Sequence, residues 1–163
     1  MESEVEDPLR LDRQVCFALA VANRAVLAVY RPLLEPMGLT HPQYLVMLAL
    51  WGEAPMSVKD IGEAIQLDSP TLSPLLKRLE AAGLITRRRD PHNERNLIVD
   101  LTPAGRELRT EAEKIPPAVV SRLGVSLADL EELRDVLGRV NTAARRSVLA
   151  EAASAEPQKG LRT

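Results

Sequence analysis

Hydrophobic residues in the N-terminal part of the chain repeat at helical spacing. Between Leu9 and Leu34, apolar side chains recur every three or four residues, as they do along one face of an α-helix. Phe17, Val21 and Ala25 are also apolar but fall outside that stripe. The pattern predicts a long helix with a second apolar surface, most simply one that packs against another subunit. The stripe consists of Leu11, Val15, Leu19, Ala22, Val26, Val29 and Leu33.

Two shorter helices are predicted next. Thr40 and Gln43 have the spacing of a capping box, so a helix should begin after Thr40 and continue through the apolar segment 45–51. Ser57 fits the N-cap of a second, short helix. The inward face of that short helix would consist of Val58, Ile61 and Ile65.

A further helix is predicted over residues 69–83, after a turn at 66–68. Gly83 suits the position just beyond its C-terminus. Pro74 lacks the N–H that a helix interior needs, which predicts a local distortion or a later helix start. The inward positions are Leu72, Leu75, Leu76 and Leu79.

A β-hairpin and two helices complete the pattern. Residues 84–89 and 97–101 read as strands, separated by the polar turn 90–96. Thr102 and Pro103 then fit the N-cap and first position of a helix. Pro116–Pro117 should break or kink the helix that begins at Pro103. Ser126 fits the N-cap of the final helix.

This order predicts a mainly α fold with a small β-hairpin wing. The middle of the chain reads as a winged helix-turn-helix, and the N- and C-terminal helices would form a dimerisation domain. We expect a disordered lead at 1–8, helical dimerisation regions at 9–37 and 104–150, a DNA-binding domain at 38–103, and a flexible tail at 151–163.

Charge is distributed unevenly over the predicted domains. The whole chain has a net charge of -2, yet the segment from Lys77 to Arg95 has six basic and three acidic residues, a local net of +3. A basic helix face is often simply solvated, and arginines on a strand can protect an exposed edge. Their position on a helix-turn-helix and wing favours DNA binding, with Arg95 at the hairpin tip reaching a minor groove. The candidate contacts are Ser69, Thr71, Ser73, Lys77 and Arg78 on the helix, and Arg87, Arg88, Arg89 and Arg95 on the wing.

Composition excludes several other classes of protein. A single cysteine, Cys16, rules out a disulfide within the chain, and with only two histidines no metal site or cofactor is expected. The acidic N-terminus lacks the order of a signal peptide, and no uninterrupted apolar run reaches membrane-spanning length. We therefore expect no membrane association, a cytoplasmic protein, and a reduced thiol at Cys16.

The chain resembles the MarR family of dimeric winged-helix regulators, and within it the organic hydroperoxide-sensing OhrR subfamily of the single-cysteine type. The resemblance covers residues 10–150 and implies a regulator, by analogy a repressor, of an inverted-repeat operator. The stretches that carry it are CFAL at 16–19, YRPLL at 30–34, GLTHPQYLVMLALW at 38–51, LDSPTLSPLLKRLEAAGLITRRRDP at 67–91, and ERN at 94–96 followed by LTPAG at 101–105.

The resemblance gives Cys16 a role as the redox-sensing thiol. Tyr30 matches a tyrosine that hydrogen-bonds the thiolate from the partner subunit, and His41 stands where the subfamily usually has a second tyrosine. Cys16 and Tyr30 are 14 residues apart, which is ~21 Å along one helix, so they can meet only across a dimer. Two departures from the subfamily are Ala20, often an aromatic residue, and Asn93, often aspartate.

The implied chemistry is oxidation of Cys16 by an organic hydroperoxide, followed by capping with a low-molecular-weight thiol or as a sulfenamide. Three alternatives stay open. Cys16 could be structural packing in a regulator released by a small aromatic ligand, and slow alkylation of the thiol would favour this. The chain could be a thiol peroxidase, although it offers no resolving cysteine, or an architectural DNA binder without sequence preference.

Overall fold

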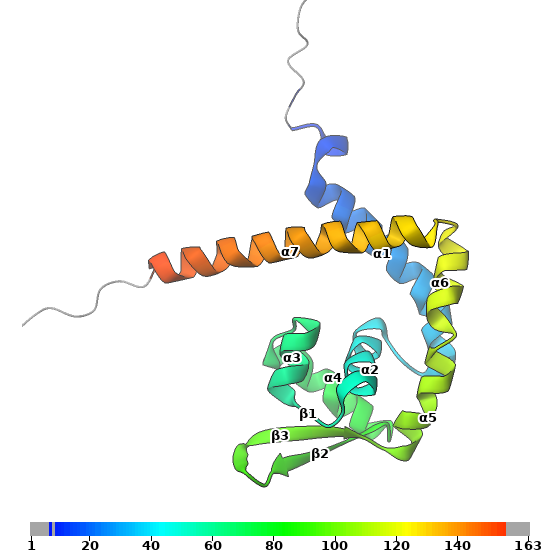
Figure 1. Cartoon of the computed structure of the whole chain (residues 1–163), viewed down its shortest axis with the longest axis vertical. Coiled ribbons are helices and arrows are strands. Elements are labelled where there is room, and N and C mark those ends of the chain that lie inside the picture. Colours follow the sequence, from blue (N-terminus) through cyan, green and yellow to red (C-terminus); the bar gives the residue numbers. More distant parts are fainter. Residues whose placement is uncertain (1–6, 8, 156–163) are drawn as a thin grey trace, which may run out of the picture. The chain divides into compact units, whose positions relative to one another are not determined.

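The structure, a computed structural model, describes Asp7 and residues 9–155 and divides into two compact units, Met1–Leu123 and Gly124–Thr163 (Figure 1). The predicted fold class, mainly helical with a small β wing, is confirmed. The first unit contains η1 (Leu11–Arg13), α1 (Val15–Leu34), η2 (Glu35–Met37), α2 (His41–Glu53), β1 (Met56–Ser57), α3 (Val58–Ile65), α4 (Ser69–Ala81), β2 (Ile85–Asp90), β3 (Asn93–Leu101), α5 (Pro103–Ala112) and α6 (Ile115–Leu123), and the second contains α7 (Leu127–Ala155).

The N-terminal helix is shorter than its apolar pattern predicts. Gln14 adopts an extended backbone, with φ -83° and ψ 120°, and separates the short 3-10 helix η1 from α1. At the other end, Gly38 turns the chain with φ +68° before α2 begins. The predicted capping box is present: the Gln43 N–H donates to the Thr40 hydroxyl, and the Thr40 N–H donates to the Gln43 side chain.

The hydrophobic core of the first unit lies among α2, α3, α4 and the sheet. Each of these helices packs against the other two, and α4 also packs against β2. Long aliphatic side chains dominate the core, as the low aromatic content requires. The most deeply buried of them are Leu34, Val46, Met47, Leu50, Ile61, Leu72, Leu76, Leu79, Ile85 and Val99.

The turn between α3 and α4 is tight. Gln66 takes up a left-handed backbone with φ 57°, and the Leu67 N–H donates to the Gly62 carbonyl at 2.9 Å. A Cβ on Gly62 would lie 2.8 Å from the Leu67 carbonyl oxygen, so glycine is needed there. Helix α4 starts at Ser69, capped by Asp68, and continues past Pro74 to Ala81. The expectation of a later helix start was therefore wrong.

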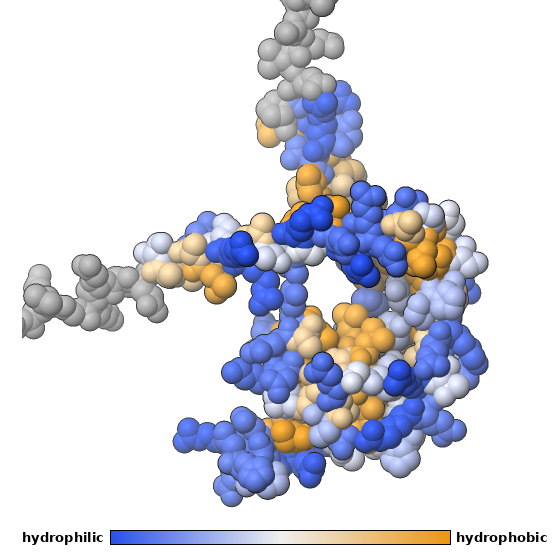
Figure 2. All heavy atoms as spheres, viewed as in Figure 1, coloured by the Kyte–Doolittle hydropathy of each residue, from blue (hydrophilic) through white to orange (hydrophobic). Residues whose placement is uncertain are grey.

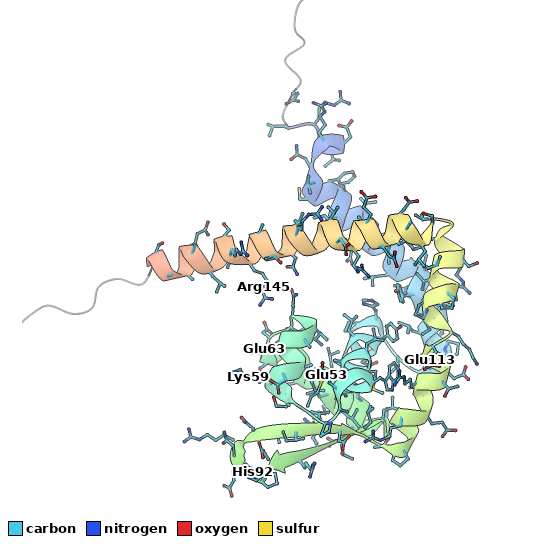
Figure 3. All side chains as sticks on the ribbon, in the orientation of Figure 1. Glu53, Lys59, Glu63, His92, Glu113 and Arg145 are labelled. Carbon is cyan, nitrogen blue, oxygen red and sulfur yellow. The ribbon has the colours of Figure 1, made fainter. Side chains whose placement is uncertain are left out.

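The wing is a three-stranded antiparallel sheet in the order β1-β3-β2. Its regular pairs join residues 85–89 with 97–101, as the hairpin pattern predicts. Asp90 pairs with Asn93, so residues 94–96 bulge from β3 without partners on β2. Figure 3 labels His92 at the free end of this wing. The predicted turn over 90–96 is thus a shorter turn plus a bulge, and Arg95 lies in the bulge and not at the hairpin tip.

Strand β1 was not predicted from the sequence. Its two residues pair with β3 through Met56 with Val99 and Ser57 with Ile98. A two-residue strand has too little sequence for an alternating pattern, so only the long-range pairing reveals it.

The last helices start where their capping residues predict. The Gly105 N–H donates to the Thr102 hydroxyl at 3.0 Å at the start of α5, and the Asp129 N–H donates to the Ser126 hydroxyl at 3.1 Å before α7. Pro116 and Pro117 fall in the first turn of α6, where a missing N–H breaks no helix bond. Helix α7 includes residues 151–155 of the expected tail. Residues 156–163, and the expected lead at 1–8 apart from Asp7, lie outside the described residues.

The segment Val15–Met37 is long and apolar enough to cross a membrane by length and composition. The expectation of no such segment considered only uninterrupted apolar runs. This segment is interrupted by Arg24 near its middle, and an arginine at the centre of a bilayer costs about 2.5–3.5 kcal/mol on insertion scales. Figure 2 shows apolar side chains on the surface of α1.

Candidate DNA-binding surface and thiol site

Helix α4 has a buried leucine face and an exposed polar face. Leu72, Leu75, Leu76 and Leu79 are buried in the core, as predicted. This orientation leaves the opposite face to solvent, which is the arrangement of a helix that enters the DNA major groove. All five predicted contact residues of this helix are exposed: Ser69, Thr71, Ser73, Lys77 and Arg78.

The N-terminus of α4 is capped by Asp68. The Thr71 N–H donates to the Asp68 carboxylate at 2.8 Å. Hydrogen bonds from the Thr71 hydroxyl and amide lower the pKa of the Asp68 carboxyl, so the carboxylate is charged at neutral pH. The cap fixes the first turn of α4, on which Ser69 and Thr71 are exposed.

The four wing arginines fall into two groups. Arg88, Arg89 and Arg95 are exposed, and the hydrophilic free end of the wing is visible in Figure 2. Arg87 is half-buried and pairs with Glu80 of α4, with Nη2 2.6 Å from Oε2. Arg87 therefore has different surroundings from the other three arginines predicted to contact DNA.

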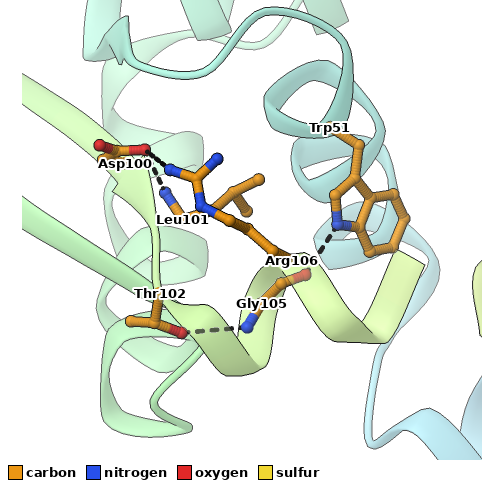
Figure 4. A network of polar contacts seen from close by, with 6 residues as sticks. All are labelled: Trp51, Asp100, Leu101, Thr102, Gly105 and Arg106. Carbon is orange, nitrogen blue, oxygen red and sulfur yellow. Dashed lines mark hydrogen bonds and ion pairs between the residues drawn. The ribbon is translucent and has the colours of Figure 1, made fainter. Parts of the chain in front are cut away.

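A hydrogen-bonded junction joins the wing to α5 (Figure 4). The Trp51 indole N–H donates to the Gly105 carbonyl at 2.8 Å, and the Thr102 hydroxyl donates to the Gly83 carbonyl at 2.6 Å. Arg106 pairs with Asp100 at 2.9 Å on β3. This junction sets the position of the base of the wing relative to α2 and α5.

Cys16 is a free, exposed thiol in the first turn of α1. Large apolar side chains around it along the helix are also exposed, including Val15 at 68% and Leu19 at 40%. Tyr30 lies at the other end of the same helix, so a single chain does not bring it to Cys16. The structure does bring together the two predicted thiolate donors, since the rings of Tyr30 and His41 are 5.2 Å apart, edge to face.

Tyr30 and His41 belong to a larger aromatic cluster. Tyr44 lies 6.1 Å from Tyr30 between ring centroids, and Trp51 lies 6.4 Å from Tyr44. Burial lowers the pKa of His41, which keeps its imidazole neutral at pH 7, and burial followed by the proximity of Tyr30 raises the pKa of Tyr44. Within the described residues, neither the Tyr30 hydroxyl nor the His41 ring has a hydrogen-bond partner.

Sequence reasoning missed Glu80, Tyr44, Trp51 and Gly105. Strand alternation was the available signal for Glu80: Arg87 faces the same side as the buried Ile85, and an inward arginine needs a carboxylate. The helical spacing of Tyr44 and Trp51, seven residues apart, was the signal for the aromatic cluster.

A pocket of about 560 Å³ lies beside His41. Its walls include the apolar residues Leu27, Leu34 and Leu39, and its polar residues include Arg31 and Glu35. The charged side chains of this lining are one cation, Arg31, and one anion, Glu35, beside the neutral imidazole of His41. Among the residues that the structure describes, no group of three or more His, Cys, Asp or Glu side chains is placed to hold a metal ion.

Known proteins are similar to this chain in sequence and in fold. The MarR family model matches residues 39–97. The organic hydroperoxide resistance transcriptional regulator of Bacillus subtilis is 40% identical over 131 residues, covering 80% of this chain and 89% of that protein. The HTH-type transcriptional regulator TtmR of Methylorubrum extorquens is 46% identical over 132 residues, covering 81% of this chain and 68% of that protein.

A solved structure gives the same result for the fold. Reduced AbfR bound to DNA has a TM-score of 0.74 and 33% identity, covering 85% of this chain and 95% of that chain. AbfR comes from Staphylococcus epidermidis and has also been solved in an overoxidised, DNA-bound form and in a disulfide form.

The helix-turn-helix, the antiparallel wing and the exposed basic residues on both define a winged-helix DNA-binding protein. The chain belongs to the MarR family of transcriptional regulators. The relatives named above are transcriptional regulators, which favours a regulator over the thiol peroxidase alternative.

Proposed function

We propose that this protein is a cytoplasmic, homodimeric repressor that senses organic hydroperoxides through Cys16 and then releases its operator. The observation that carries the proposal is the exposed thiol of Cys16 on an apolar helix surface. The relative from Bacillus subtilis supports the choice of oxidant, because its name links a similar chain to organic hydroperoxide resistance. The forms in which AbfR has been solved support cysteine oxidation in a protein of the same fold.

The homodimer would bury the apolar surface that a single chain exposes. On α1 the exposed large residues include Val15, Phe17, Leu19 and Val21. On α7 they include Leu133, Leu137 and Val140. Large apolar side chains exposed along a helix mark a protein interface, and a second copy of the chain supplies a self-complementary partner.

The charges of α7 support an antiparallel pairing of this helix between two copies. Its N-terminal part is acidic and its C-terminal part is basic, so only the antiparallel arrangement places opposite charges together. From Asp129 to Asp135 the helix has Asp129, Glu131, Glu132 and Asp135 with one basic residue, Arg134, and from residue 139 onward it has Arg139, Arg145 and Arg146 with one acidic residue, Glu151.

The apolar stripe sets a register for that pairing. If Leu137 of one copy lies opposite Val140 of the other, Leu133 lies opposite Ala144, and the acidic end of each helix lies beside the basic end of its partner. The symmetry of the dimer repeats each of these contacts on the other side of the axis.

In the dimer, Tyr30 and His41 of one subunit would hydrogen-bond the Cys16 thiolate of the other. Their 5.2 Å ring separation presents two donors together, and neither donor is used within its own chain among the described residues. A neutral His41 can still donate one N–H to sulfur. The ~21 Å that separates Cys16 from Tyr30 along α1 requires the second subunit.

The sensing reaction is an oxygen transfer. The Cys16 thiolate attacks the terminal oxygen of the hydroperoxide, a sulfur–oxygen bond forms, and the O–O bond breaks. The alkoxide leaves and takes up a proton to become an alcohol, and Cys16 becomes a sulfenic acid. A low-molecular-weight thiol then condenses with the sulfenic acid, releasing water and forming a mixed disulfide, since the chain has no second cysteine.

Release of DNA follows from the size and polarity of this product. A mixed disulfide cannot remain in a close apolar contact, so the two subunits must shift. The operator is an inverted repeat whose half-sites lie about one helical turn, ~10 bp, apart. A shift between subunits moves the two α4 helices out of step with these half-sites.

The test is a gel shift on the intergenic region next to the gene, with and without cumene hydroperoxide. We expect the peroxide to release the wild-type protein, and Cys16→Ser to bind equally well but stay bound. A Cys16→Ser protein that still leaves the DNA on peroxide addition would refute the thiol switch.

The pocket beside His41 supports a second candidate function. Arg31 and the surrounding leucines would hold a small aromatic carboxylate, whose binding would release DNA with Cys16 acting only as packing. Release of the Cys16→Ser protein by an aromatic acid such as salicylate, and no release of an Arg31→Ala variant, would favour this candidate. The two candidates differ in that only the peroxide response depends on the thiol.

A further inference from the structure

One arginine of the wing is bound to the recognition helix by three hydrogen bonds. Glu80 lies in the last turn of α4, and Arg87 is the third residue of β2. The Arg87 Nε donates to Glu80 Oε2 at 3.0 Å, Nη2 donates to the same oxygen at 2.6 Å, and the Arg87 backbone N–H donates to Oε1 at 3.2 Å. These bonds fix the strand and the helix relative to each other.

The surroundings of Arg87 differ from those of its neighbours. Its side chain is 24% exposed, whereas Arg88 and Arg89 are open to solvent. The Arg87 side-chain hydrogen bond lowers the pKa of Glu80, so the carboxylate is charged and holds the guanidinium at neutral pH. A phosphate contact by Arg87 would require these bonds to break.

We propose that Arg87 is a positioning residue, whose bonds to Glu80 hold the wing at a set angle to the recognition helix. This orientation allows α4 to enter the major groove while Arg88, Arg89 and Arg95 reach the DNA beside it. The inference rests on the proposed DNA contacts of α4 and the wing, and it assigns Arg87 a different role from the other three arginines.

The variant Glu80→Gln distinguishes a positioning role from a purely electrostatic one, because the two predict opposite changes in DNA affinity. Removing a carboxylate from a surface that faces phosphates reduces repulsion, so charge alone predicts tighter DNA binding by Glu80→Gln. Loss of the pair that positions the wing predicts weaker binding, although the variant is more positive. Glu94→Gln is the matched control, because Glu94 is an exposed carboxylate of the wing bulge without a partner among the described residues.

The experiment is a fluorescence anisotropy titration of the full-length, reduced protein on a labelled duplex of the adjacent intergenic region, at several salt concentrations. We expect Glu80→Gln and Arg87→Ala each to weaken binding about 5- to 10-fold, and the double variant to be no worse than either single variant. The slope of log K against log salt should stay at the wild-type value for both. Arg88→Ala should reduce the steepness of that slope by ~0.9, as expected for one lost phosphate contact.

Three results would overturn the proposal. One is tighter binding by Glu80→Gln that matches Glu94→Gln. Another is an Arg87→Ala slope reduced by ~0.9, which would mark a direct phosphate contact. The third is wild-type affinity and slope for both Arg88→Ala and Lys77→Ala, in which case the DNA surface itself is wrong and the positioning role fails with it.

A charge-swapped variant keeps the test decisive if a single substitution disturbs folding, as judged by circular dichroism. The double variant Glu80→Arg/Arg87→Glu retains an ion pair between α4 and β2 with its polarity reversed. Affinity within about threefold of wild type supports the positioning role. A loss as large as that of the single variants overturns it.

Discussion

Gly105 is the residue at which a single methyl group should do most damage to the wing. An added Cβ would lie 2.0 Å from the Leu84 carbonyl oxygen and 3.0 Å from its carbonyl carbon. Real Cβ atoms essentially never approach other atoms within 3.0 Å, so the substitution Gly105→Ala must move α5 and the base of the wing apart by about 1 Å. The obstacle is backbone on both sides and cannot rotate away.

The expected change in the free energy of unfolding follows from two opposing effects. Forcing an extra methyl group into a packed site costs about 1–3 kcal/mol, and a backbone obstacle places Gly105→Ala at the upper end. Alanine favours a helix over glycine by about 1 kcal/mol, which offsets part of this. The net loss of about 2 kcal/mol corresponds to a decrease in Tm of about 4–8 °C for a chain of this size.

The matched control is Gly52→Ala in α2. A Cβ at Gly52 meets no atom within 4 Å, so this variant should gain the helix preference without a clash and melt slightly above wild type. Both can be followed by the fluorescence of Trp51, the only tryptophan, whose indole binds the Gly105 carbonyl. Protein concentration must be equal throughout, because dimerisation shifts the Tm.

DNA affinity provides the second readout. Displacing the base of the wing should weaken operator binding by Gly105→Ala and leave Gly52→Ala near wild type. If Gly105→Ala has the same Tm and the same DNA affinity as Gly52→Ala, the junction accepts a methyl group and the reasoning is wrong.

Three further predictions concern charge. In α7, Leu137→Asp places a charge in the exposed apolar stripe and should weaken dimerisation about 10-fold or more in sedimentation equilibrium, whereas unchanged dimerisation would reject this stripe as part of the interface. Burial lowers the pKa of His41, so the unfolded state binds more protons and the free energy of unfolding falls as pH drops through the ordinary value of 6.5. In urea unfolding at several pH values, His41→Gln should lose this pH dependence. An equal dependence of the free energy of unfolding on pH in both proteins would contradict the prediction. Arg95→Ala should lower the salt slope of DNA binding by ~0.9 in anisotropy, and an unchanged slope would place Arg95 away from the DNA.

Local chemistry made much of the fold predictable. The N-caps Thr40, Ser57, Thr102 and Ser126 each satisfy an amide only a few residues away, so their spacing in the sequence is sufficient. The paired part of the wing was likewise predictable, because one face of 97–101 alternates into the core.

The features that escaped prediction depend on contacts between distant residues. For α4, Pro74 predicted a local distortion or a later start, and the helix starts at Ser69 because four leucines buried against distant parts of the chain outweigh one missing hydrogen bond. The bond between Trp51 and Gly105 spans 54 residues, and no local pattern specifies it. The thiol site stays a prediction, because Cys16 and Tyr30 lie near opposite ends of α1 within one chain.

Because of the bulge at residues 94–96, the length of the wing can change without a change in the stability of the fold. The regular ladder between 85–89 and 97–101 is anchored by buried residues, whereas the bulge pairs with nothing on β2. Insertions or deletions in this segment would lengthen or shorten the protruding end without changing which residues enter the core. Natural variation and engineering can therefore alter how far the wing extends along the DNA while the scaffold that carries it stays the same.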